Sequence, residues 1–150
     1  MLPRFAKPAE ERSRNMRAIR SFGNKTTETR FGAALAGRGI SGWKLHSKEV
    51  LGFPDFYFPG KKLVVFVDGC FWHGCPKCGH IPKTNVRYWR KKILRNKRRD
   101  VLIRRALRAA GFSVLRIWEC ELRRSPYACV SRVTHVLRVS AALKTRKRKM

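Results

Sequence analysis

Cysteine and histidine side chains are concentrated in one short stretch, VDGCFWHGCPKCGH at residues 67–80, which holds three cysteines and two histidines. Cys75 and Cys78 are separated by two residues, the spacing at which two thiolates commonly bind one zinc ion. A tetrahedral structural site needs four ligands, and we expect Cys70 and Cys120 to be the others. Cys120 ends a later apolar segment, and strand ends can meet despite their separation in sequence. The pattern predicts a closed four-thiolate zinc site.

The remaining cysteine and histidine positions leave alternatives open. His80 lies two residues after Cys78 and competes for one ligand position. Cys129 lies on the apolar face of a predicted helix, where a buried core thiol is expected. The N-terminus lacks the pattern of a secretory signal, which favours a reducing compartment and metal binding over disulfides. Four unrelated reduced cysteines are the alternative to a zinc site.

Acidic residues are scarce, with 9 Asp and Glu against 36 Lys and Arg. Asp55 follows a proline at the start of a predicted strand, Asp68 ends another strand, and Glu28 lies in the first turns of a predicted helix. Carboxylates gathered at strand ends offer the oxygen ligands that Mg²⁺ prefers. The pattern predicts a magnesium site of the kind found in nucleases. The alternative is that Asp55 and Asp68 are turn or cap residues.

His73 is the other candidate for chemistry, because it follows Cys70 by three residues on a segment that zinc would hold rigid. A histidine placed there could act as general base toward a water that attacks phosphorus. The alternative is that His73 is a zinc ligand or supports one.

The elements that must position these residues follow from the apolar pattern of the chain. We expect a short basic helix at 13–21, a helix at 27–39, short strands and turns at 40–62, a strand at 63–67, one long helix or two close ones at 84–111, a strand at 112–119 and a helix at 125–144. The apolar run LVVFV is typical of a central strand buried on both faces. This order predicts an α/β fold with a small mixed sheet and helices on both sides.

The length of 150 residues and the 43% hydrophobic content suit one compact domain. We expect that domain at 13–143, between a flexible N-terminal arm at 1–12 and a basic disordered tail at 144–150.

The formal net charge is +27, which indicates a polyanionic partner, and nucleic acid is the obvious one. No apolar stretch of ~18 residues is present, so we expect no membrane span. A cytoplasmic location at the bacterial nucleoid is the expectation that fits both features. On charge alone, a ribosomal or nucleoid-coating protein fits as well as an enzyme.

Several motifs occur in a fixed order: NMRAI, GFPDF, VFVDGCFWHGC, YWRKKI followed by N and then by RD, and GFSVLRIWEC. In this order the chain resembles the very-short-patch repair (Vsr) DNA mismatch endonucleases, from about residue 13 to about residue 121. The resemblance implies the restriction-endonuclease-like PD-(D/E)xK fold with a structural zinc ion. It also implies an enzyme that uses Mg²⁺ to nick one strand of double-stranded DNA on the 5′ side of the thymine at a T:G mismatch.

The same resemblance implies roles for individual residues. Asp55 would be the principal magnesium ligand, and Val67 would bind the metal through its backbone carbonyl. His73 would be the catalytic histidine, with Glu28 supporting the site from its helix. The zinc ligands of the family fall on Cys70, Cys75, Cys78 and Cys120.

The resemblance further implies a DNA-binding surface. Phe71, Trp72 and Trp89 resemble an aromatic wedge that inserts into the base stack beside the mismatch. The alternative, strongest for Trp89 inside an amphipathic helix, is that these rings belong to the core. Met16, Lys92 and Asn96 would lie near the mismatched bases.

Some positions depart from typical members of the family. Asp68 stands where a histidine is typical, so it is a candidate second magnesium ligand. Val67 lacks the hydroxyl group found there. Cys70 stands where the lysine of a PD-(D/E)xK motif would fall, so His73 must transfer the proton.

These features predict a monomeric endonuclease that initiates mismatch repair. One alternative is a nuclease of the same fold that cuts matched DNA, as restriction or homing enzymes do. Another is a non-enzymatic zinc-bearing DNA-binding protein.

Overall fold

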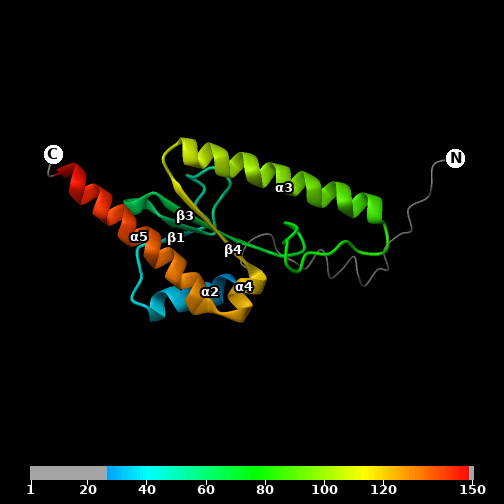
Figure 1. Cartoon of the computed structure of the whole chain (residues 1–150), viewed down its shortest axis with the longest axis horizontal. Coiled ribbons are helices and arrows are strands. Elements are labelled where there is room, and N and C mark those ends of the chain that lie inside the picture. The colour runs from blue at the N-terminus through cyan, green and yellow to red at the C-terminus, as the bar shows by residue number, and fades with distance from the viewer. Residues whose placement is uncertain (1–26, 149–150) are drawn as a thin grey trace.

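The computed structural model describes residues 27–148, so the predicted arm at 1–12, the predicted helix at 13–21 and Met16 lie outside the described part of the chain. Its elements in chain order are α2 (Glu28–Gly37), β1 (Lys44–Leu45), β2 (Phe56–Phe58), the 3₁₀ turn η1 (Pro59–Lys61), β3 (Leu63–Asp68), α3 (Val86–Ala109), β4 (Ser113–Trp118), α4 (Glu119–Arg124) and α5 (Pro126–Arg148) (Figure 1). This order confirms the mixed α/β class.

The four strands form one mixed sheet in the order β1-β2-β3-β4. β1 and β2 pair antiparallel, as do β2 and β3, whereas β3 and β4 are parallel. A parallel pair needs a crossover connection, and α3 supplies it. The carboxyl ends of β3 and β4 therefore lie side by side, with Asp68 opposite Trp118.

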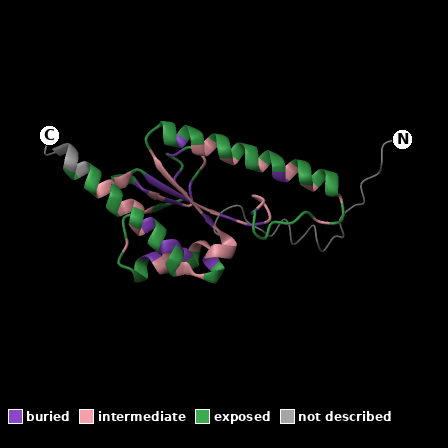
Figure 2. Ribbon diagram, viewed as in Figure 1, coloured by how far each residue is buried: buried purple, intermediate pink, exposed green. Residues whose placement is uncertain are grey.

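Helices cover both faces of the sheet, and the alternation along β3 assigns its residues to the two faces. Leu63 and Val65 pack in the core beneath α2, α4 and α5. Val64 packs in a smaller core with Leu107 of α3. Figure 2 shows buried residues along the strands and on the inner sides of α2 and α5, whereas most of α3 is exposed. The N-terminal half of α3 extends past the sheet, alongside the segment that follows β3 (Figure 1).

Most element ends differ from the sequence-based expectation by one or two residues, and two differences are larger. The predicted strand at 112–119 ends at Trp118, and the short helix α4 follows directly, so Cys120 lies on a helix rather than on a strand. The Glu121 side chain accepts a hydrogen bond from the Trp118 N–H at 3.2 Å, which favours this first turn. α5 continues to Arg148, so residues 144–148 are helical where a disordered tail was predicted. Lysine and arginine favour helix, and no glycine or proline interrupts 144–148.

Among residues 27–148, the helices are all too short or too polar to cross a bilayer. This part of the chain therefore contains no candidate membrane-spanning helix.

Candidate functional site

The β1–β2 hairpin and the start of α2 place Glu28, His46 and Asp55 together. His46 directly follows β1 and Asp55 directly precedes β2, and the His46 N–H donates to the Asp55 carbonyl oxygen at 3.2 Å. His46 Nε2 lies 2.9 Å from Glu28 Oε2, and its Nδ1 lies 3.9 Å from Asp55 Oδ1. On β3, the Val67 N–H donates to Asp55 Oδ2 at 2.6 Å, which fixes the carboxylate against the central strand.

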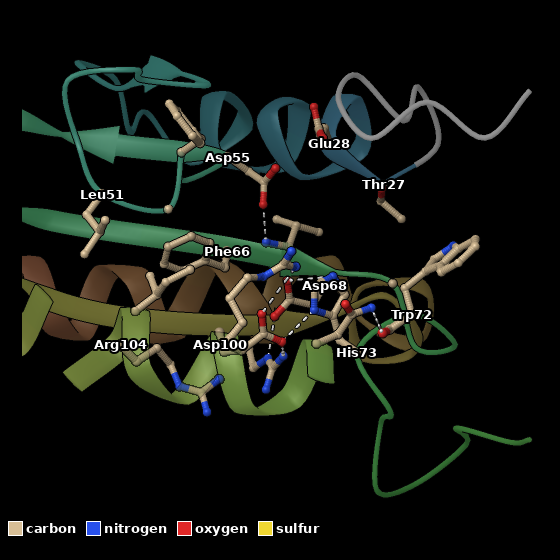
Figure 3. A pocket seen from close by; sticks show the side chains of 18 of the residues that line it. Thr27, Glu28, Leu51, Asp55, Phe66, Asp68, Trp72, His73, Asp100 and Arg104 are labelled. Atoms are coloured by element: carbon tan, nitrogen blue, oxygen red, sulfur yellow. Dashed lines mark hydrogen bonds and ion pairs between the residues drawn. The ribbon is translucent and has the colours of Figure 1, made fainter. Parts of the chain in front are cut away.

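A second group lies where β3 ends, and it contains Asp68, His73 and Asp100. His73 Nδ1 hydrogen-bonds to Asp100 Oδ2 at 2.6 Å, and His73 Nε2 lies 3.7 Å from Asp68 Oδ1. Glu28 and Asp55 of the first group line one cavity of about 780 Å³ together with Asp68, His73 and Asp100 of the second, and Figure 3 shows the two sets on opposite sides of it. The structure therefore brings all four predicted catalytic residues to a single cavity.

The pKa of Asp55 is raised to about 7, chiefly by burial; the Val67 N–H opposes the shift, and the nearby carboxylates of Glu28 and Asp68 add to it. A divalent cation would offset this repulsion. Asp55 and Glu28 offer carboxylate oxygens, and these two side chains and His46 place one ligand atom each within 4.8 Å of one another. These residues fit a hard divalent cation. The Val67 carbonyl and the Asp68 carboxylate are not part of this group, and their role as magnesium ligands stays a prediction.

Magnesium is expected to stabilise the protein more at about pH 8 than at about pH 6. Because the pKa of Asp55 is raised, its contribution to the stability of the metal-free protein is full below its ordinary pKa of 3.8 and is lost as the pH rises through about 7. Mg²⁺ binds the ionised carboxylate and restores that contribution at the higher pH. Thermal denaturation with and without Mg²⁺ at both pH values measures the difference. An equal Mg²⁺-induced rise in Tm at both would contradict it, and Asp55→Asn is the control that removes the effect.

Asp100 is a site residue that was given no role from the sequence, although it ends the motif that begins with YWRKKI. It is the one acidic residue on the strongly basic helix α3, and this isolation is the signal that could have drawn attention to it. Burial would raise its pKa, but the hydrogen bond from His73 and the charges of His73 and Arg116 outweigh burial and lower it. Asp100 therefore stays ionised and fixes the orientation of the His73 ring.

Arg116 of β4 is a second residue that the sequence did not reveal. Its Nε donates to Asp68 Oδ2, its Nη2 donates to Asp100 Oδ2 at 2.9 Å, and its guanidinium carbon lies 4.1 Å from the centre of the Trp118 ring. One guanidinium thus pairs with both carboxylates that face His73.

The four thiols predicted to bind zinc lie together, each Sγ within 4.8 Å of the others. Cys75 Sγ is 3.8 Å from Cys120 Sγ, and the Cys120 N–H donates to Cys70 Sγ at 3.4 Å. Burial opposes ionisation of Cys75, but N–H groups of Cys78 and Lys77 donate to its sulfur and lower its pKa to about 7. A sulfur held by backbone donors and surrounded by three thiols suits a zinc thiolate.

The competing residue His80 lies outside this group, and its ring packs 5.6 Å from the Phe71 ring between centres. Cys129 is 2% exposed in the main core, as predicted for a core thiol. The geometry favours the four-cysteine set over a site that uses His80.

The purified protein is expected to contain one zinc ion, and Cys75→Ser is expected to lose it and to lower Tm. Loss of a structural zinc removes binding free energy that contributes to folding. Metal analysis and thermal denaturation measure the two effects. Cys129→Ala is the matched control, because it removes a buried thiol outside the cluster and should retain zinc. A Cys75→Ser protein that keeps its zinc would contradict the assignment.

The predicted wedge residues form an aromatic cluster beside the cavity. The Phe71 ring centre lies 5.1 Å from that of Trp72 and 5.2 Å from that of Trp89. Lys92 Nζ lies 5.6 Å from the Trp72 ring centre, and Asn96 Nδ2 donates to the Trp72 carbonyl at 2.9 Å. The three rings are only partly buried and belong to neither core. Their packing contradicts the alternative that they are core residues.

Comparison with known proteins gives the same family that the motifs indicate. The family model described as DNA mismatch endonuclease Vsr matches residues 6–78. The chain is 40% identical to the type II nicking enzyme V.NaeI of Lentzea aerocolonigenes, over 84% of this chain and 78% of that one. It is 36% identical to the DNA mismatch endonuclease Vsr of Escherichia coli K12, over 75% of this chain and 71% of that one.

A third relative, the type II nicking enzyme V.XorIIP of Xanthomonas oryzae pv. oryzae, is 46% identical over 53% of this chain, and the match spans 60% of that relative's length. The two longer matches each cover more than two thirds of the relative. The chain therefore belongs to the Vsr family of DNA mismatch endonucleases.

Proposed function

We propose that the protein is a magnesium-dependent DNA endonuclease that nicks one strand on the 5′ side of the thymine in a T:G mismatch. Endonuclease activity follows from its family. The observation that carries the finer proposal is that the predicted catalytic carboxylates and His73 line the same cavity as Trp72, Lys92 and Asn96. A backbone phosphate can thus lie at the acidic end while a disturbed base step meets the aromatic cluster.

Asp55 and Glu28 would hold the magnesium ion, with the Val67 carbonyl and Asp68 as the further predicted ligands. Bound magnesium supplies charge neutralisation at the phosphate and lowers the pKa of a coordinated water. His73 is the proton-transfer residue. Its Nδ1 is occupied by Asp100, so Nε2 is the nitrogen that exchanges a proton with water or with the leaving oxygen.

The aromatic cluster of Phe71, Trp72 and Trp89 would enter the base stack and exchange base stacking for aromatic stacking. A mismatched step is easier to open than a matched one, and this difference supplies selectivity. Basic residues along the exposed face of α3 would neutralise backbone phosphates, which makes binding weaken steeply with salt. One chain carries every residue of the site, so we propose that it acts as a monomer.

A nicking assay with each strand labelled tests the proposal. A duplex with one T:G mismatch is compared with its T:A counterpart across varied flanking sequences, with Mg²⁺ and then with EDTA. The expected result is a nick beside the mismatched thymine that disappears in EDTA. Equal cutting of the matched duplex would instead assign the protein to the enzymes that cut a matched site. Tight binding without any cutting, across a library of flanking sequences, would instead indicate a DNA-binding protein without nuclease activity.

Trp72→Ala is expected to reduce the preference for T:G over T:A, because the cluster loses the ring that lines the cavity. Stacking of one base on an aromatic ring contributes about 1–3 kcal/mol, so the preference should fall by roughly 5- to 150-fold. The ratio of kcat/KM values for the two duplexes measures it. Tyr127→Ala is the control, because Tyr127 is an exposed aromatic residue of α5 that does not line the cavity. An unchanged ratio in Trp72→Ala would exclude Trp72 from mismatch recognition.

A further inference from the structure

His46 lies among the carboxylates of the proposed metal site, although none of the motifs that indicate the function includes it. Its Nε2 is 2.9 Å from Glu28 Oε2 and its Nδ1 is 3.9 Å from Asp55 Oδ1. Its side chain is 28% exposed, compared with 12% for Glu28 and 15% for Asp55. The imidazole is therefore partly exposed to solvent, and its inner side faces the two less exposed carboxylates.

The backbone at His46 is held in an uncommon conformation. Its φ is +46°, in the left-handed region, which costs a residue other than glycine about 1 kcal/mol. The hairpin holds this conformation through the hydrogen bond from the His46 N–H to the Asp55 carbonyl. Strained residues of this kind cluster at functional sites. His46 is one of four described residues other than glycine with a positive φ, and it is the one whose ring lies beside both carboxylates.

The chemistry of the three side chains indicates a particular class of metal ion. Glu28, His46 and Asp55 place two carboxylate oxygens and one imidazole nitrogen within 4.8 Å of one another. Magnesium prefers oxygen ligands only, whereas divalent transition-metal ions such as Mn²⁺ accept both oxygen and imidazole nitrogen. A nitrogen donor between the carboxylates is therefore not expected in a site that binds only magnesium.

We propose that His46 is a ligand of the metal site, and that Glu28, His46 and Asp55 together bind Mn²⁺ more tightly than Mg²⁺. This inference rests on the proposed function, because it concerns the same metal site. It differs from that function in assigning a nitrogen ligand and a transition-metal preference, and both can be measured without DNA cleavage.

The experiment is electron spin-echo spectroscopy of Mn²⁺ added to the full zinc-loaded chain without DNA. A directly bound imidazole adds nitrogen modulation to the echo, and labelling the histidines with ¹⁵N must change that modulation. His46→Gln is expected to abolish it and to weaken Mn²⁺ binding by about tenfold or more, while Mg²⁺ binding changes much less. His46→Asn is the second variant, because asparagine tolerates the left-handed backbone and guards against loss of folding. His135→Gln on α5 is the matched control.

The outcomes separate the inference from the proposed function. Mn²⁺ binding that depends on Asp55 but carries no nitrogen modulation would overturn the role of His46 and leave the proposed metal site intact. Modulation that persists in both His46 variants would also overturn it, and would assign the nitrogen to another histidine. Binding that survives Asp55→Asn unchanged would contradict the proposed metal site itself.

Discussion

Asp55→Asn is expected to lower the rate of nicking at a T:G mismatch by roughly 10³-fold, equivalent to about 4 kcal/mol of transition-state stabilisation. The carboxylate is 15% exposed, accepts a hydrogen bond from the Val67 N–H and faces Glu28 and His46. An amide of the same shape keeps the hydrogen bond to Val67 but removes the charge that binds a cation. The loss should therefore appear in kcat and in Mg²⁺ affinity, while binding of the DNA duplex changes little.

The same substitution should leave the metal-free fold as stable as before, or more stable, at about pH 8. Ionisation of Asp55 is disfavoured by burial and by the neighbouring carboxylates, so a neutral amide relieves an unfavourable charge. Loss of activity without loss of Tm separates a catalytic role from a structural one. Glu49→Gln is the matched control, since Glu49 is an exposed carboxylate that pairs with Lys44 at 3.1 Å. Undiminished nicking by Asp55→Asn would mean that the chemistry lies elsewhere.

The parts of the fold that could be predicted are those with a strong local pattern. The run LVVFV is continuously apolar, which is typical of a strand that is buried on both faces, and it forms most of β3. The periodic basic segment became α3 as one continuous helix. α4 could not be predicted, because six residues carry little periodicity. Its start depends on a contact between Glu121 and the Trp118 N–H.

The candidate site divides in the same way. Cysteine spacing predicted the thiol cluster, and the resemblance to the family named Asp55 and His73, which both line the cavity. Asp100 and Arg116 were missed because their roles arise only when α3 packs beside the paired ends of β3 and β4. In the parallel register Asp68 lies opposite Trp118, and Arg116 is two residues earlier on the same face. The sequence shows Asp100 as an isolated acid and places both residues in the family motifs, but it does not show that they lie beside Asp68 and His73.

Arg116→Met is expected to lower the free energy of unfolding by about 3 kcal/mol and to reduce nicking by roughly 10²-fold. The guanidinium is 19% exposed, and it pairs with Asp68 and Asp100, each 12% exposed. Without it, two buried carboxylates repel each other. His73 then loses its fixed orientation, because Asp100 is the group that binds its Nδ1. Denaturant unfolding and single-turnover nicking measure the two losses.

The double variant Arg116→Met/Asp68→Asn tests this account, because it removes one of the two repelling carboxylates. It should recover much of the lost stability but not the nicking, because the predicted magnesium ligand Asp68 is then lost as well. Arg123→Met is the matched control, since Arg123 is 70% exposed and pairs with Glu119 at 3.0 Å, a surface ion pair that contributes about 1 kcal/mol or less. If Arg116→Met proves no more costly than this control, the two carboxylates do not depend on Arg116. If the double variant regains nicking as well as stability, Asp68 is not a magnesium ligand that the reaction requires.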